Sequence, residues 1–219
     1  MVSVIIPAFN ETDTISQVIK VADSHKWVKE IIVVDDGSED DTSMKSIKNK
    51  VNVTISLPKN EGKAAAMERG VAHASNDVIC FLDADIKNLN QKNLTKMLRP
   101  VIAGSADMSV GICGREKYKL NKLLIFLPIL GGQRVLKKNI WHKIPPNYKK
   151  DFQIEIALNY FSKISGQKIS IEILDNLKHV PKEKKYGITT GLWRRLRMCL
   201  DIVKVSLTLY CYETAKRKV

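Results

Sequence analysis

The sequence predicts an α/β fold in which helices cover both faces of a mostly parallel central sheet. Strand-like and helix-like segments alternate along the first 113 residues, as they do in chains built from βαβ units. Residues 78–82 form a continuous apolar run, which is typical of a parallel strand covered on both faces. The chain has 219 residues, 44% of them hydrophobic, and can therefore bury one large core.

Apolar spacing sets the elements expected in the first half of the chain. Strands are expected at residues 2–6, 30–36, 51–57, 78–84 and 107–113. Helices are expected between them, at residues 12–26, 38–50, 61–75 and 90–100. The second of these helices begins with serine and acidic side chains, which suit a helix N-terminus. The fourth should end at Pro100, because proline cannot donate the hydrogen bond that a helix interior requires.

The second half of the chain has a less regular pattern. Its expected elements are a glycine turn with a short helix at residues 131–141, a helix at 151–165, a strand at 167–174, a basic loop at 179–191 and an amphipathic helix at 192–213. We therefore divide the chain into two halves of one domain, residues 1–112 and 113–190. A basic C-terminal helical extension, residues 191–219, follows them.

The net charge of +13 at pH 7 is concentrated in the second half. Residues 1–112 carry 13 Lys/Arg and 15 Asp/Glu, whereas residues 113–219 carry 23 Lys/Arg and 8 Asp/Glu. Such an asymmetry favours an anionic partner, namely phosphate, lipid head groups or nucleic acid. The alternative is a soluble, lysine-rich surface.

Three features favour a cytoplasmic location. The first residues already form a strand pattern rather than a secretory leader. The four cysteines form no CxxC pair, which indicates reduced thiols. The longest apolar run, residues 123–130, is too short to span a bilayer, which takes about 20 helical residues.

Polar residues and glycines follow four of the expected strands, in the stretches PAFNE, DDGS, KNEGK and DAD. Ligands of open α/β sheets bind beyond the carboxyl ends of the strands. One such stretch can be a helix cap, but four in succession favour a shared ligand site. The P-loop pattern GxxxxGK[ST] and the dinucleotide pattern GxGxxG are both absent, which counts against those two kinds of nucleotide site.

Asp83 and Asp85 predict a cation site. In an extended chain, residues two apart point to the same side, so these carboxylates repel each other unless a cation neutralises them. Mg²⁺ or Mn²⁺ takes one or two carboxylates and completes its shell with phosphate oxygens and water, which indicates a metal–diphosphate site. Lys63 follows a glycine at a helix start, where it could approach phosphate. Asp36, with its neighbour in DDGS, either caps the next helix or binds a base or ribose.

Four motifs in order resemble those of a family-2 glycosyltransferase of the GT-A fold: VSVIIPAFNE, EIIVVDDGSEDDT, KNEGKAAAMERGV and VICFLDADI, within residues 2–86. The resemblance implies a hexosyltransferase that uses a UDP- or GDP-sugar donor and Mg²⁺ or Mn²⁺. It makes residues 1–112 the donor-binding half and residues 113–190 the acceptor-binding half. By position, the resemblance implies the following donor residues: Pro7, Ala8, Glu11 and Asp36 at the nucleoside, Ala84 at the ribose, and Asp83 and Asp85 as the DXD motif at metal and diphosphate.

The second half resembles the family less closely. GGQRVLKK is similar to a Gly-x-Arg segment near the acceptor, and DFQIEIALNYF to a helix that carries an acid there. A general base for an acceptor hydroxyl would be Asp151 or Glu155, and we prefer Glu155, although it could be an ordinary surface acid. A phosphate acceptor needs no strong base, because it is already anionic near neutral pH. The QxxRW motif of processive synthases is missing, which argues against a chain-building synthase.

Several further residues have two interpretations. His179 resembles a histidine that completes the metal site in some relatives, although a lone histidine is commonly structural. Lys182 and Lys185 could close over diphosphate or an anionic acceptor, and so could Arg115 and Arg134. Each of these four could also be ordinary surface charge.

The C-terminal segment, residues 192–213, combines basic residues with an apolar face and a tryptophan, which favours contact with an anionic membrane surface. Packing on the protein's own core is the alternative. The resemblance to polyprenyl-phosphate sugar transferases implies inverting transfer to a lipid phosphate by a peripheral protein at the inner face of the cell membrane. Three alternatives remain: a soluble phosphorylated acceptor, as in glucosyl-3-phosphoglycerate synthases; a sugar-nucleotide pyrophosphorylase, whose glycine-rich loop is missing; and a non-catalytic membrane- or nucleic-acid-binding module. We expect no nucleic-acid partner, and a homo-oligomer is left open.

Overall fold

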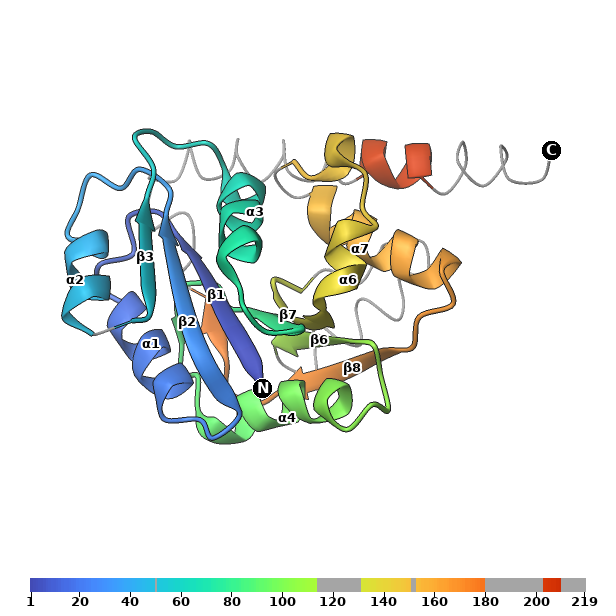
Figure 1. Cartoon of the computed structure of the whole chain (residues 1–219), viewed down its shortest axis with the longest axis horizontal. Coiled ribbons are helices and arrows are strands. Elements are labelled where there is room, and N and C mark those ends of the chain that lie inside the picture. The colour runs from blue at the N-terminus through green and yellow to red at the C-terminus, as the bar shows by residue number, and fades with distance from the viewer. Residues whose placement is uncertain (50, 114–130, 151–152, 180–202, 210–219) are drawn as a thin grey trace.

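A seven-stranded sheet runs through the centre of the molecule in the computed structural model, which describes residues 1–49, 51–113, 131–150, 153–179 and 203–209 (Figure 1). The strand order is β3-β2-β1-β4-β7-β6-β8. The strands are β1 (Val2–Ala8), β2 (Val28–Asp35), β3 (Val53–Ser56), β4 (Val78–Phe81), β6 (Met108–Cys113), β7 (Gln133–Lys137) and β8 (Ile169–Leu174). Among the described strands of this sheet, only β7 runs antiparallel to its two neighbours, which confirms the mostly parallel α/β fold.

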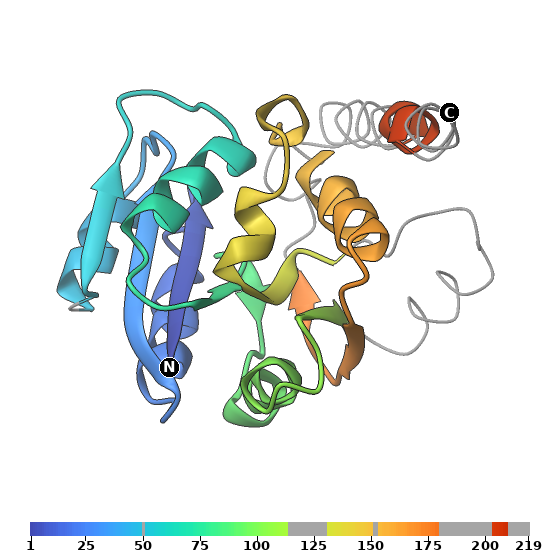
Figure 2. The ribbon, with the colours of Figure 1, turned by 45° about the vertical axis from the view of Figure 1, so that its right-hand side comes forward.

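Helices cover both faces of this sheet (Figure 2). The helices are α1 (Ile15–Asp23), α2 (Thr42–Lys48), α3 (Lys63–His73), α4 (Gln91–Ile102), α6 (Lys138–His142) and α7 (Gln153–Ile164), with a 3₁₀ turn η1 (Pro146–Tyr148). Side chains of β1 alternate between two apolar clusters, because successive strand residues point to opposite faces. Ile5 lies in the cluster with α3, α6 and α7, whereas Val4 and Ile6 lie in the cluster with α1 and α4.

Close packing of α3 on β1 positions the start of this helix over the sheet. A Cβ at Gly70 of α3 would lie 2.3 Å from Cγ2 of Ile5. Glycine therefore lets the helix approach the strand more closely than any other residue would. Ala64 and Met67 of α3 are buried in the same cluster as Ile5, so the first turn of the helix, which carries Lys63, is held against the sheet.

Residues 203–209 form the described part of the C-terminal segment. Val205 and Leu209 are buried in the cluster that contains α7, whereas Val203 and Leu207 are exposed by 48% and 59%. One face of this short helix thus packs on the core, and the other face is apolar and exposed. None of the helices within the described ranges is long and apolar enough to cross a membrane.

The short elements β5 (Ile86–Lys87), β9 (Lys178–His179) and η1 were not predicted, and β7 and α4 differ from the sequence prediction in kind or extent. Residues 133–137 form β7 where the sequence predicted a turn and short helix, and the helix α6 begins only at Lys138. Helix α4 continues through Pro100 to Ile102. Pro100 lies in the last turn, where it removes one hydrogen bond, and the next turn still closes because Ala103 donates to the carbonyl of Arg99 at 2.9 Å.

Candidate functional site

The loops that follow β1, β2 and β4 lie side by side, because these strands are parallel neighbours in the sheet. Two of the expected residues, Asp36 and Asp83, contact the residues at the start of α3. Pro7 and Ala8 are buried at the end of β1, and Glu11 is half-buried in the loop beyond it. Ala84 is also buried, while Asp83 and Asp85 on either side of it are half-buried.

Asp36 ties the end of β2 to the loop that begins α3. Its two carboxylate oxygens accept hydrogen bonds from the backbone N–H groups of Glu61, at 2.7 Å, and Gly62, at 2.9 Å. Burial raises the pKa of Asp36 above its ordinary value, although these two N–H groups oppose the shift. Asp35 accepts from the backbone N–H of Ser38 at 3.0 Å, and the N–H of Thr42 at the start of α2 is bound by Asp40 instead.

Lys63 joins two carboxylates that are far apart in the sequence. Its ammonium lies 2.6 Å from Oδ1 of Asp83 and 3.3 Å from Oε1 of Glu155. Burial alone would lower the pKa of Lys63, but the two carboxylates outweigh it and raise the pKa above its ordinary value. The ammonium is therefore charged throughout the physiological range and neutralises both acids in part.

The opposite oxygen of Asp83 is bound by a residue that the sequence analysis missed. Gln133, fully buried on β7, donates from Nε2 to Oδ2 of Asp83 at 2.8 Å and accepts from the Asp83 backbone N–H at 3.0 Å. A Cβ on Gly132 would lie 2.2 Å from the same Oδ2. The glycine before Gln133 thus leaves the space that the carboxylate occupies, and the Gly-Gly-Gln run was the signal that could have revealed it.

Arg134 is placed differently from the expectation of an anion-binding surface residue. It is fully buried, and it donates from Nη1 to Oδ1 of Asn159 at 2.8 Å and from Nε to the carbonyl of Gly131 at 2.9 Å. Burial lowers the pKa of Arg134 to about 10, and the charge of Glu155 partly opposes this shift. Glu155 is 8% exposed and shares one face of α7 with Asn159, so it is not an ordinary surface acid.

Two short strands place His179 near the acidic pair. Strand β5 (Ile86–Lys87) pairs with β9 (Lys178–His179), and Ile86 is the partner of His179 in this register. The backbone of His179 therefore lies beside the residue that follows Asp85. No group of three His, Cys, Asp or Glu side chains that could hold a metal occurs within the described residues, which do not include the side chain of His179.

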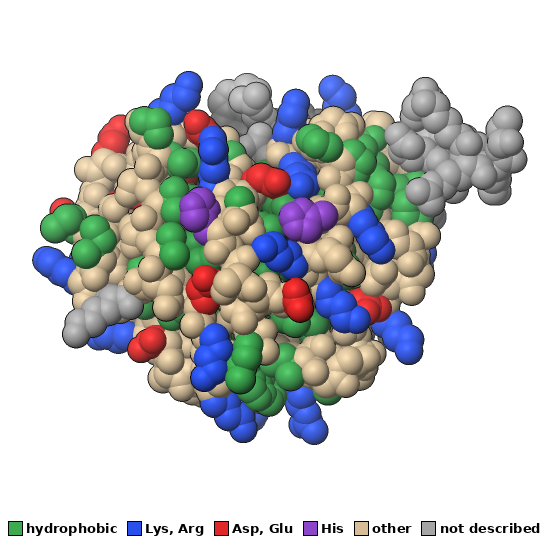
Figure 3. Space-filling model, viewed as in Figure 1, with side chains coloured by type: hydrophobic (Ala, Val, Ile, Leu, Met, Phe, Trp, Pro, Cys, Tyr) green, Lys and Arg blue, Asp and Glu red, His purple; other side chains and the backbone are tan. Residues whose placement is uncertain are grey.

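Four other predicted site residues, Arg115, Asp151, Lys182 and Lys185, lie outside the described residues. On the face shown in Figure 3, the described lysine and arginine side chains are interspersed with acidic ones rather than gathered into one basic patch.

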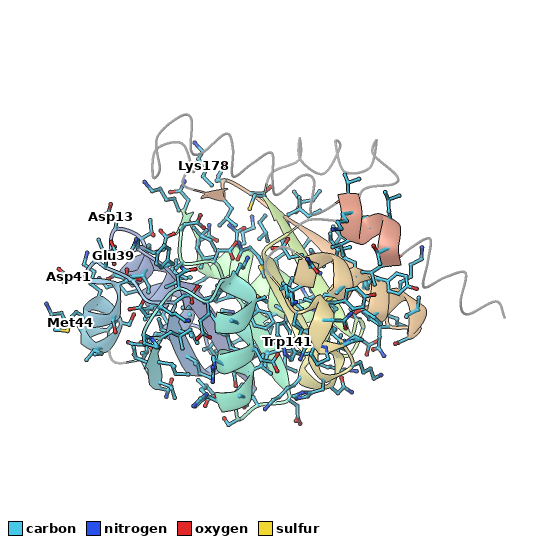
Figure 4. All side chains as sticks on the ribbon, turned by 90° about the horizontal axis from the view of Figure 1, so that it is seen from above. Asp13, Glu39, Asp41, Met44, Trp141 and Lys178 are labelled. Atoms are coloured by element: carbon cyan, nitrogen blue, oxygen red, sulfur yellow. The ribbon has the colours of Figure 1, made fainter. Side chains whose placement is uncertain are left out.

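A hollow of about 340 Å³ lies beside the start of α3, lined by Glu61, Ala64, Ala65, Glu68, Arg69, Pro146 and Lys149. Trp141 of α6, buried next to α3, donates a hydrogen bond of 2.6 Å to Glu68, one of the residues that line this hollow (Figure 4). Lys149 also binds Glu68, at 2.8 Å, and Arg69 lies 3.7 Å from Glu61. Lys149 and Arg69 are therefore each paired with an acidic residue that lines the same hollow.

Curated proteins and solved structures both match this chain. A glucosyl-3-phosphoglycerate synthase of Mycobacterium tuberculosis is 30% identical over 142 residues, which are 61% of this chain and 44% of that protein. An undecaprenyl-phosphate 4-deoxy-4-formamido-L-arabinose transferase of Salmonella choleraesuis is 34% identical over 96 residues, 40% of this chain and 29% of that protein. The chain thus spans less than half the length of either relative.

The solved structures establish the fold. That of the Mycobacterium tuberculosis glucosyl-3-phosphoglycerate synthase with Mn²⁺, UDP and glucosyl-3-phosphoglycerate matches with a TM-score of 0.76 at 22% identity, covering 95% of this chain and 79% of that one. Its complex with Mg²⁺ and UDP matches with a TM-score of 0.69 at 24% identity, covering 91% and 79%. The family model "Glycosyl transferase family 2" matches residues 3–159. The chain therefore belongs to glycosyl transferase family 2, and its fold is of the GT-A type.

Proposed function

We propose that the protein is a glycosyltransferase that takes a sugar from a UDP- or GDP-sugar and depends on Mg²⁺ or Mn²⁺. The single observation that carries this proposal is the cluster at the carboxyl ends of β1, β2 and β4, where Asp83 already binds a cation, the Lys63 ammonium. Ligands of open α/β sheets bind at this edge. The solved relatives that share the fold contain Mn²⁺ or Mg²⁺ together with UDP.

In this proposal, residues 1–112 bind the donor. Asp83 and Asp85 hold the metal, and His179 joins them, since β9 brings its backbone next to Ile86. When bound, the metal neutralises the diphosphate that leaves with the nucleotide. Pro7, Ala8, Glu11, Asp36 and Ala84 form the nucleoside end of the site. Asp36 acts by fixing the loop that precedes Lys63, because both its oxygens are bound to that loop.

The transfer itself makes one bond and breaks one. An acceptor oxygen attacks the anomeric carbon, and the bond between this carbon and the diphosphate breaks with its electron pair leaving on the nucleotide. In this proposal Lys63, which lies between Asp83 and Glu155, contacts that diphosphate. A phosphate acceptor brings no proton that must be removed. Glu155 would take the proton of an acceptor hydroxyl, and inversion at the anomeric carbon stays a prediction for product analysis.

We propose a lipid phosphate as the acceptor, bound by residues 113–190 at an anionic membrane surface. The exposed apolar face of residues 203–209, with Val203 and Leu207 beside Lys204, supports this choice. The curated relative from Salmonella is a transferase for undecaprenyl phosphate. A soluble phosphorylated acid is the second candidate, because the relative that matches the larger share of this chain is a glucosyl-3-phosphoglycerate synthase.

A transfer assay with two acceptors distinguishes these candidates. Radiolabelled UDP-glucose and GDP-mannose are offered with Mn²⁺ and either polyprenyl phosphate in anionic liposomes or 3-phosphoglycerate in solution. Sugar in the lipid fraction supports the lipid acceptor, and label only in the aqueous product refutes it. Flotation with the same liposomes tests the membrane surface: Leu207→Glu should abolish flotation of a folded protein. Equal flotation of Leu207→Glu and wild type would remove this helix face from the proposal.

Leu209 supplies the matched control for that helix face. It is fully buried two residues further on, so Leu209→Glu should lower the unfolding temperature because it buries a charge in the core. Leu207→Glu should leave the unfolding temperature unchanged. The pair separates loss of membrane contact from loss of fold.

A further inference from the structure

Both carboxylate oxygens of Asp83 are already occupied by groups of the protein itself. Oδ1 is bound by the Lys63 ammonium at 2.6 Å, and Oδ2 by Nε2 of Gln133 at 2.8 Å. Each oxygen keeps a second lone pair that can bind a metal ion, but a metal on Oδ1 would share that atom with the ammonium, and the two positive charges would repel each other at close range. Gln133 is fully buried and is tied to Asp83 a second time, through the Asp83 backbone N–H, so it cannot leave without breaking both bonds. Lys63 is the donor that can leave.

Lys63 has a second carboxylate within reach. Glu155 lies 3.3 Å from its ammonium, a longer contact than the one to Asp83. If the ammonium withdraws from Asp83 it still faces Glu155, so the move leaves no unpaired charge on the lysine. The side chain of Lys63 is 27% exposed, against 18% for Asp83 and 11% for Glu155, which makes it the most accessible of the three.

We propose that Lys63 competes with the metal ion, so that the metal binds strongly only together with a nucleotide diphosphate. Without nucleotide, the ammonium neutralises Asp83 and repels a divalent cation that would take its place. A bound diphosphate would offer the ammonium a new anionic partner, and Lys63 would then leave Asp83 to the metal. Lys63 is thus a positioning residue that couples the binding of the two ligands, with Glu155 as its alternative partner. This inference rests on the proposed metal site at Asp83 and Asp85.

Mn²⁺ binding without nucleotide provides the test, because it needs no turnover. The signal of free Mn²⁺ in electron paramagnetic resonance gives the dissociation constant for wild type, Lys63→Met and the control Lys92→Met, which removes an exposed lysine of α4. Lys63→Met should bind Mn²⁺ alone at least about tenfold more tightly than wild type, because a unit charge next to the ligand is gone. Lys92→Met should match wild type.

The same variants measured with UDP should show the opposite order. Lys63→Met should bind UDP in the presence of Mn²⁺ about tenfold more weakly than wild type, because the ammonium no longer meets the diphosphate. Glu155→Gln should weaken binding of Mn²⁺ alone, since it removes the alternative partner of Lys63. In the Lys63→Met background, Glu155→Gln should have no effect on Mn²⁺ binding. If Glu155 acted only through its negative charge near the metal, Glu155→Gln would weaken Mn²⁺ binding in both backgrounds. Thermal unfolding verifies that each variant folds, and Lys63→Gln replaces Lys63→Met if the latter does not.

The outcomes separate this inference from the function on which it rests. If wild type binds Mn²⁺ with UDP while Lys63→Met binds Mn²⁺ alone no better than wild type, the competition is refuted and the metal site stands. If neither wild type nor Lys63→Met binds Mn²⁺, with or without UDP, the proposed metal-dependent function fails and this inference fails with it.

Discussion

Gly132 provides a direct test of the geometry at Asp83. In Gly132→Ala the new Cβ would lie 2.2 Å from Oδ2 of Asp83, 2.9 Å from its Cγ and 3.0 Å from Oδ1, whereas an ordinary contact begins at 3.4 Å. The carboxylate must therefore retreat by roughly 1 Å, a displacement that can lower the rate of an enzyme about 100-fold. The φ angle of Gly132 is not in the left-handed region, so the alanine adds no backbone strain of its own.

The retreat also breaks the bond from Gln133, a fully buried amide, which costs about 1–3 kcal/mol of stability. We expect Gly132→Ala to reduce kcat/KM about 100-fold in a nucleotide-release assay with Mn²⁺, and to lower the free energy of unfolding in urea. Gly104→Ala is the control: its φ is +72° and nothing lies within 4 Å of the added Cβ. It should cost about 1–2 kcal/mol of stability and no activity. Wild-type activity in Gly132→Ala would refute the placement of Asp83.

Three further predictions concern the scaffold. Burial, helped by the charge of Lys26, lowers the pKa of His25 below its ordinary value of 6.5, so the unfolded chain binds a proton more readily than the folded one. The free energy of unfolding should therefore fall as the pH drops below 6.5, and urea unfolding at pH 7.5 and 5.5 should show a larger loss in wild type than in His25→Gln. Equal losses in the two proteins would contradict this prediction. Asp36→Asn places an amide NH₂ against the N–H of Gly62 and should lower the free energy of unfolding in urea by about 1–3 kcal/mol. It should also weaken UDP binding measured by calorimetry. An unchanged affinity would show that this loop does not contribute to donor binding. Trp141→Phe removes the hydrogen bond to Glu68 and should lower the free energy of unfolding by about 1 kcal/mol, as measured by chemical denaturation. An unchanged free energy of unfolding would show that this bond adds nothing to stability beyond what water supplies.

The donor half of the fold follows from the sequence because its signals are local. Strands β1 and β4 are short apolar runs, β3 alternates, and α1 shows the 3.6-residue spacing of one buried face. The acidic pair at Asp83 and Asp85 stands at the end of such a strand. The motif and its position at the end of a strand can therefore be predicted from the sequence alone.

The rest of the site depends on contacts between distant segments. Strand β7 was missed because Gln133 and Arg134 are polar, and their burial makes sense only with Asp83 and Asn159 as partners. The contact between Lys63 and Glu155 joins residues separated by 92 positions, and no local pattern marks it. Helix α4 continues past Pro100 because a proline in the last turn removes only one backbone hydrogen bond. Whether a proline ends a helix therefore depends on its position in the helix, which the residue type alone does not give.

The central claim is that Asp83 and Asp85 hold a metal that binds the diphosphate of a nucleotide-sugar. Thermal unfolding with UDP, GDP and their sugars, with and without Mn²⁺, tests it most directly on wild type and Asp85→Ala. At a ligand concentration 100 times its dissociation constant, the correct nucleotide should stabilise wild type by about 2.7 kcal/mol, only with Mn²⁺, and Asp85→Ala should lose this gain. If no nucleotide stabilises the protein, or if Asp85→Ala responds as wild type does, the claim is contradicted.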